Sequence, residues 1–187
     1  PEFFERARFA VDEAAKLGMK WWLYDEGGWP SGQAVGKVVE GHPELRAQRL
    51  AWEPVESTAS FAVPQDAVVL VVDDAQHTRV MPGQTWTPTP EVKTAKLYRV
   101  AQQGGPDLMN PAAVERFITL THKGYKDAAG SHFGNTIHFA FTDEPGVPNL
   151  DPPKSIPWTP EFSARPELLA QLPSLFVPPT PDMPQAD

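Results

Sequence analysis

The chain has 187 residues, a formal net charge of −8 and no cysteine, so disulfide scaffolds, thiolate zinc sites and Cys nucleophiles are excluded. The acidic balance argues against a nucleic-acid surface, which needs clustered Lys and Arg. A hydrophobic share of 41% suffices for a buried core, while no segment reaches the roughly 20 apolar residues of a membrane span.

A first helix–strand unit occupies the start of the chain. Apolar residues in 3–17 recur at three- and four-residue steps, which predicts an amphipathic helix. Gly18 follows as a helix stop. The segment 19–24 is aromatic-rich and of strand length, and it ends at Asp25-Glu26. Because the first residue is Pro and a helix begins at once, we expect the chain to be a fragment of a longer protein.

A second unit repeats this order. Asn110 and Pro111 predict a helix start, with Asn as N-cap and Pro at the first helical position. After a glycine-rich turn, residues 137–142 predict a strand that ends at Asp143-Glu144. Both units therefore deliver an Asp-Glu pair at the carboxyl end of a strand, and we expect the two strands to be parallel members of one sheet.

The segment between the two helix–strand units and the segment after them differ from both units in composition. Short β-type runs with Pro, Gly and Thr between them indicate a β-rich insertion rather than a crossover helix; the runs lie at 61–63, 67–72 and 95–100. The prediction is a first βα portion at 1–47, a β-rich insertion at 48–106, a second βα portion at 107–176, and a Pro-rich disordered tail at 177–187.

Alternating helices and strands predict the α/β class with a parallel sheet. A complete (β/α)8 TIM barrel needs about 250 residues, and two units with an insertion cannot close one. We therefore predict a partial (β/α)8 TIM barrel with a small β-rich insertion, and we expect the missing remainder of the barrel to be a partner of this fragment.

The two Asp-Glu pairs are the candidate catalytic groups. Active sites of α/β folds gather at the carboxyl ends of strands, so Glu26 and Glu144 are expected at the same rim. Two carboxylates there suit glycoside hydrolysis, with one as proton donor and the other activating water. The alternative is that each pair only caps a following helix. Because two pairs occupy the same place, the functional interpretation is favoured.

The loop after the first pair adds an aromatic residue. Trp29 follows Gly27 and Gly28, and its face either stacks on a sugar or packs the rim. If Trp29 lies beside Glu26, it raises the pKa of that carboxyl, which makes Glu26 the acid and Glu144 the base.

Other candidate chemistries are weaker. The histidines lack zinc-binding spacing, so no metal site is predicted from His122, His132 and His138. His122 is interpreted as a solvated helix residue and His138 as an interior one. Ser31 lies in Pro-Ser-Gly rather than G-x-S-x-G, which argues against a serine hydrolase.

The stretch from Leu23 to Ala34 closely resembles the YDE-x-x-WPSG-x-A signature of α-L-rhamnosidase-like enzymes, glycoside hydrolase family 106. Three further stretches fit that family in the expected order: 107–111, 141–145 and 157–160. The resemblance covers about residues 1–176. After Pro160 this chain is shorter than the family pattern.

The resemblance implies cleavage of terminal α-L-rhamnosyl bonds with inversion, a calcium site of the kind found in some members, and a secreted or periplasmic protein. The sequence by itself requires no cofactor and leaves the compartment unknown. Matched position by position, Glu26 and Glu144 are the catalytic carboxylates, and the implied substrate-binding residues are Asp25, Trp29, Asp107, Asn110 and Asp143. Two alternatives stay open: a glycosidase for another sugar, and an inactive or carbohydrate-binding remnant of such a barrel.

Overall fold

The computed structural model describes residues 2–146, 155–163, 165, 167–168 and 170–171. The chain forms two compact units: the first unit holds 1–47 and 104–148, and the second unit holds 48–103 and 149–187. Each unit has its own core, and the candidate site lies wholly in the first.

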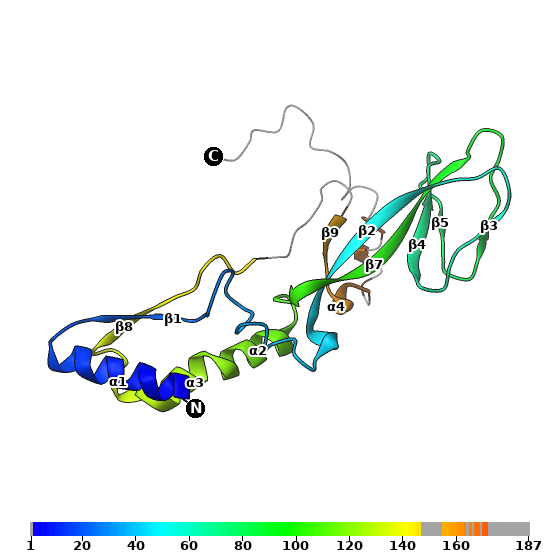
Figure 1. The fold of residues 1–187 in the computed structure, drawn as a ribbon. Coiled ribbons are helices and arrows are strands. Elements are labelled where there is room, and N and C mark those ends of the chain that lie inside the picture. Colours follow the sequence, from blue (N-terminus) through cyan, green and yellow to red (C-terminus); the bar gives the residue numbers. More distant parts are fainter. Residues whose placement is uncertain (1, 147–154, 164, 166, 169, 172–187) are drawn as a thin grey trace, which may run out of the picture. The chain divides into compact units, whose positions relative to one another are not determined.

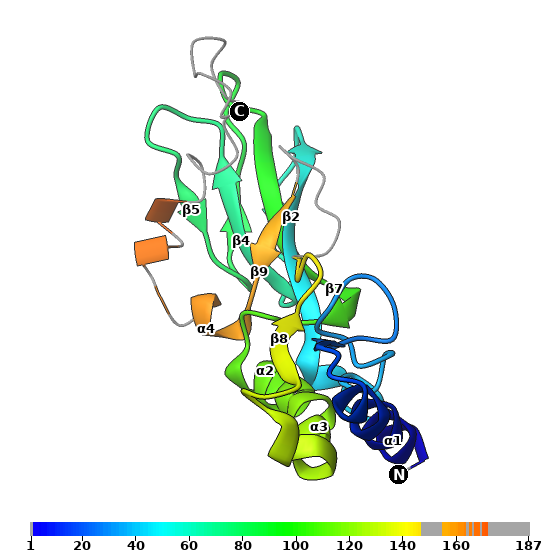
Figure 2. The same cartoon turned by 90° about the vertical axis from the view of Figure 1, so that its left-hand side faces the viewer.

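The first unit is built on one pair of parallel strands (Figures 1 and 2). Strand β1 (Trp21–Tyr24) pairs with β8 (Ile137–Phe141), and Tyr24 is the partner of Phe141. Helix α1 (Glu2–Lys16) precedes β1, and helices α2 (Pro111–Leu120) and α3 (His122–Ala129) precede β8. Two short 3-10 helices, η1 (Pro43–Leu45) and η2 (Gly130–His132), complete the unit. The predicted parallel pairing and helix–strand order are confirmed.

Helices α1 and α3 pack against each other and against one face of β1–β8. Val11, Leu23, Ala129 and Ile137 are buried in this contact. Each large apolar side chain buried here contributes about 1.5–3 kcal/mol relative to exposure.

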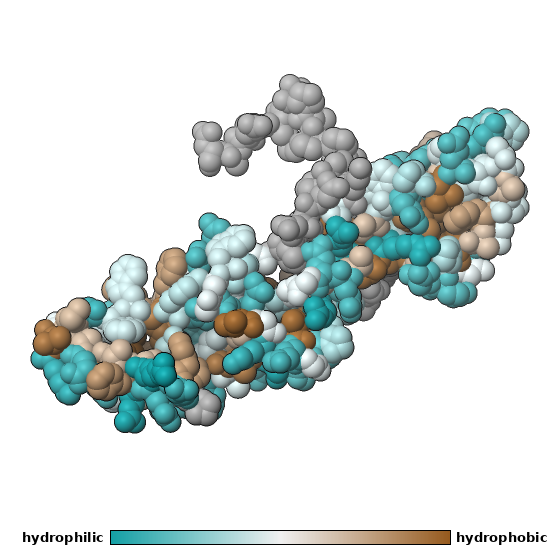
Figure 3. Space-filling model, in the orientation of Figure 1, coloured by the Kyte–Doolittle hydropathy of each residue, from teal (hydrophilic) through white to brown (hydrophobic). Residues whose placement is uncertain are grey.

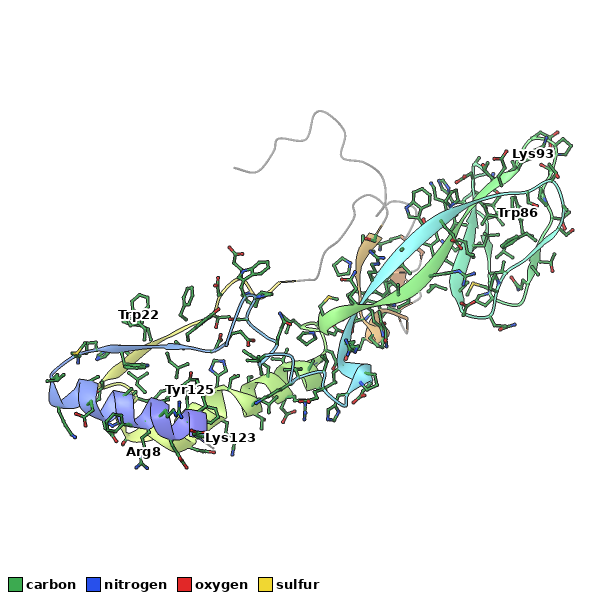
Figure 4. All side chains as sticks on the ribbon, in the orientation of Figure 1. Arg8, Trp22, Trp86, Lys93, Lys123 and Tyr125 are labelled. Carbon is green, nitrogen blue, oxygen red and sulfur yellow. The ribbon has the colours of Figure 1, made fainter. Side chains whose placement is uncertain are left out.

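The opposite face of β1–β8 carries exposed aromatic rings. Trp22 is 65% exposed and its ring contacts that of Phe139, while Tyr24 contacts Phe141. Figure 4 shows Trp22 on the side of the strands away from the helices and Tyr125 on the helix side. Brown hydrophobic patches also interrupt the teal surface in Figure 3 over the region of α2.

Helix α2 packs on the loop that follows β1. Val38, Leu45 and Phe117 belong to this second core of the first unit. Asn110 caps α2 as expected, because its side chain accepts a hydrogen bond from the Ala112 N–H. The helix ends at Leu120, and α3 begins two residues later rather than continuing as one helix.

The second unit is a five-stranded sheet in the order β5-β4-β7-β2-β9. The strands are β2 (Arg46–Glu56), β4 (Ala67–Val72), β5 (Arg79–Val80), β7 (Thr94–Pro106) and β9 (Ser155–Trp158), with the first residues of β2 and the last of β7 belonging to the first unit. A separate pair joins β3 (Phe61–Ala62) to β6 (Thr85–Trp86), and α4 (Pro160–Ser163) follows β9.

Alternation along β4 buries both of its faces. Leu70 and Val72 belong to one cluster, which includes Trp86, while Val69 and Val71 belong to the other with Trp158. Strand β4 therefore carries the continuous apolar run of a central strand.

The predicted partial (β/α)8 barrel is wrong. Among the described residues β1–β8 is a two-stranded sheet, whereas β4–β5, β4–β7 and β2–β9 pair antiparallel, and no sheet is closed. The strands of the β-rich region lie outside the β1–β8 sheet. Strand β2 also pairs with residues 155–158, which the barrel interpretation gave to the second βα portion. The predicted tail, 177–187, lies outside the described residues.

Candidate functional site

The carboxyl ends of β1 and β8 lie at the same end of the strand pair, where backbone hydrogen bonds join the two following loops. The Asp25 N–H donates to the Phe141 carbonyl at 3.3 Å. Beyond the strands, the Ser31 N–H donates to the Asp143 carbonyl and the Asp143 N–H donates to the Ser31 hydroxyl oxygen, both at 2.9 Å. The two Asp-Glu pairs are thereby brought together, as the sequence interpretation requires.

Asp25 lies at the centre of this arrangement and is only 1% exposed. Oδ1 accepts a hydrogen bond from the Ser31 hydroxyl at 2.7 Å, and Oδ2 accepts one from the Thr142 hydroxyl at 2.5 Å. His122 Nε2 lies 3.3 Å from the same Oδ2. A buried carboxylate needs such partners, so Asp25 ties both loops and the start of α3 together.

The Glu26 carboxylate accepts hydrogen bonds from four backbone N–H groups of the loop after β1. Oε1 accepts from the N–H groups of Gly27 at 2.9 Å and Val35 at 2.7 Å, and Oε2 accepts from those of Gln33 at 2.8 Å and Ala34 at 2.7 Å. The converging N–H groups form an anion-binding nest.

The nest requires unusual backbone angles. Ala34 and Val35 have φ of 49° and 55°, in the left-handed region that disfavours β-branched residues. The carboxylate of Glu26 accepts hydrogen bonds from both residues and so offsets this strain.

Glu144 is the more accessible carboxylate. Its side chain is exposed, and Oε2 accepts a hydrogen bond from the Trp29 indole N–H at 3.2 Å. The sequence interpretation expected Trp29 to desolvate Glu26, whereas this contact places its indole at Glu144. Trp29 is itself 67% exposed, so its ring face is available to a ligand.

Two tyrosines border the carboxylates. The Tyr24 hydroxyl donates to the Gly28 carbonyl at 2.9 Å, and burial raises its pKa, with further increases from the charges of Asp143, Glu26 and Asp25. The Tyr125 hydroxyl donates to the Tyr24 carbonyl at 3.1 Å. Burial and the charge of Asp25 raise the pKa of Tyr125 as well. Both phenols therefore stay neutral donors well above pH 7.

The side chains of Asp107 and Asn110 accept hydrogen bonds from backbone N–H groups around the start of α2. The Asp107 side chain is buried, its N–H donates to the Leu45 carbonyl at 2.8 Å, and Oδ1 accepts from the Met109 N–H at 3.0 Å. Among the described residues Oδ2 has no hydrogen-bond partner. The hydrogen bonds of these two side chains go to local backbone rather than to either Asp-Glu pair.

Two cavities flank Asp25 within the first unit. One, of about 420 Å³, is lined by residues that include Phe4, Glu26, Val35 and Tyr125. The other, of about 320 Å³, includes His122, Thr142 and Pro145 in its lining. Sequence reasoning missed the roles of Ser31, Thr142 and His122, since only folding brings them to Asp25. The interior position expected for His138 is wrong, because that side chain is exposed.

No group of three His, Cys, Asp or Glu side chains that could hold a metal ion gathers among the described residues. The oxygens of Asp25 and Glu26 already accept the hydrogen bonds described above. The calcium ion implied by the resemblance stays an expectation. In the described part of the chain, no helix has the length and apolar character needed to cross a membrane.

In comparisons with known proteins, no family model, curated protein or solved structure matched the chain.

Proposed function

We propose that the loops after β1 and β8 form a glycosidase site that hydrolyses terminal α-L-rhamnosyl or related bonds with two carboxylates. The observation that carries the proposal is the parallel pairing of β1 with β8, which brings two Asp-Glu pairs to one end of the strands. The sugar itself rests on the resemblance of residues 23–34 to the rhamnosidase signature.

Glu144 is the proposed base. It is exposed, and the Trp29 indole holds one of its oxygens. In an inverting reaction, Glu144 takes a proton from water while the water oxygen bonds to the anomeric carbon. In the same step the glycosidic bond breaks, and the leaving oxygen takes a proton from the second carboxylic acid, so that the anomeric carbon exchanges one oxygen for the other.

Glu26 is the proposed proton donor, and its contacts set a condition on that role. Each carboxylate oxygen accepts hydrogen bonds from two backbone N–H groups. The Glu26 side chain therefore has to leave the nest before it can donate a proton to a sugar oxygen. Opening of the loop 27–35 therefore accompanies the reaction. The same contacts favour the alternative of a site that binds a sugar without turnover, because a Glu26 that stays in the nest donates no proton.

Hydrolysis of 4-nitrophenyl α-L-rhamnoside by the purified chain tests the proposal. We expect turnover by the wild type and a loss of roughly 100-fold or more in Glu144→Gln, the range of a general base. Glu115→Gln makes the same change at an exposed position of α2 and is the control. Sugar binding without turnover would establish the alternative, and equal activity of Glu144→Gln and the control would refute the role of Glu144.

A further inference from the structure

We propose that His122 is a ligand-binding residue of the cavity beside Asp25, and that its ring forms a hydrogen bond with a sugar hydroxyl. The inference rests on the proposed function for the class of ligand, and it adds a residue that the two-carboxylate scheme does not use.

The cavity has about 320 Å³, a volume that suits a small ligand, and its lining combines apolar and polar side chains. Leu108, Phe117 and Ile118 supply apolar walls, and His122 and Thr142 supply polar groups. The His122 ring packs edge-on against Phe117, with ring centroids 5.6 Å apart. The ring is thus held on one side, and the side chain is 35% exposed.

Asp25 lies beside this ring, because His122 Nε2 is 3.3 Å from the buried Oδ2. An imidazole has two ring nitrogens, and each of them can form a hydrogen bond. A sugar hydroxyl in the cavity can therefore bond to the ring while Nε2 stays next to Asp25.

The first unit also contains a built-in comparison. His132 also lies beside a carboxylate: its Nε2 is 2.7 Å from Asp12 Oδ1, at hydrogen-bond distance, and its side chain is 18% exposed. His132 is absent from the lining of both cavities described above. Ligand protection at His122 but not at His132 therefore reports the cavity rather than the His–Asp pair.

The test is carbethoxylation of the wild-type chain with diethylpyrocarbonate at pH 7, read for each histidine by mass spectrometry. The reaction is run with L-rhamnose, L-fucose, D-galactose or D-glucose present. We expect a sugar to slow modification of His122 at least threefold while the rate at His132 stays unchanged. In parallel, His122→Gln should weaken binding of that sugar at least tenfold, and His132→Gln should not.

The outcomes separate the two proposals. Protection by L-rhamnose supports both, and protection only by another sugar supports the cavity while refuting rhamnose as the ligand. Equal L-rhamnose affinity of wild type and His122→Gln overturns the role of His122 and leaves the glycosidase proposal standing. Protection by no sugar overturns the inference.

Discussion

Replacing Glu26 by Gln tests how the loop after β1 is held. The carboxylate accepts four backbone N–H bonds, two on each oxygen. A Gln carbonyl can keep two of them, whereas its NH₂ group faces the other two donors. Two charge-assisted bonds of about 1.5–3 kcal/mol each are lost. Because the Glu26 side chain is half-buried, solvent reduces the cost, and we expect a loss of roughly 2–4 kcal/mol.

For a unit of this size, the loss corresponds to a decrease in Tm of roughly 8 °C or more. The assay is thermal unfolding by circular dichroism, with hydrogen exchange at the Gln33, Ala34 and Val35 amides, which should become much faster. Glu40→Gln makes the same change at an exposed nearby side chain and is the control. A Tm within about 2 °C of that control, with unchanged exchange at those amides, would refute the nest as the element that holds the loop.

Two further predictions concern the cores of the units. At Gly124 an added Cβ would lie 2.2 Å from Cζ of Phe4. Gly124→Ala should therefore lower the free energy of unfolding by about 1–3 kcal/mol, because the site becomes overpacked. An increase of about 1 kcal/mol, which is the usual preference of a helix for Ala over Gly, would contradict the packing of α1 on α3. Burial, with the charge of Asp73, raises the pKa of Tyr98 to about 12, so its contribution to stability is complete below about pH 10 and is lost as pH rises to the folded-state pKa. Denaturant unfolding of wild type and Tyr98→Phe between pH 9 and 12 should show a steeper decline for wild type, and identical slopes would contradict this.

Local signals in the sequence predicted the first unit well. The three- and four-residue spacing of apolar residues, Gly18 and the Asn110–Pro111 helix start all correspond to observed elements. The parallel pairing followed because each helix–strand unit ends in the same Asp-Glu pair. These features depend on neighbouring residues, which a single sequence displays directly.

The errors arose where distant segments meet. The antiparallel pairing of β2 with residues 155–158 joins segments about a hundred residues apart, and no local pattern indicates it. The side-chain contacts of the site were not predicted either, because they also join residues that are distant in the sequence. Trp29 was expected at Glu26 because the two are close in sequence, yet its indole reaches Glu144, and the N–H groups that hold Glu26 come from residues up to nine positions later.

NMR of the tryptophan indole N–H signals during titration with L-rhamnose tests for a sugar site at the shared end of β1 and β8. Trp29 donates its indole N–H to Glu144, so a sugar at this site should shift the Trp29 signal in a saturable way. Trp86, buried in the second unit, should stay unchanged. We expect a saturable shift of the Trp29 signal alone. An unshifted Trp29 signal, or a shift at Trp86 instead, would show that L-rhamnose does not bind at this end of the strands.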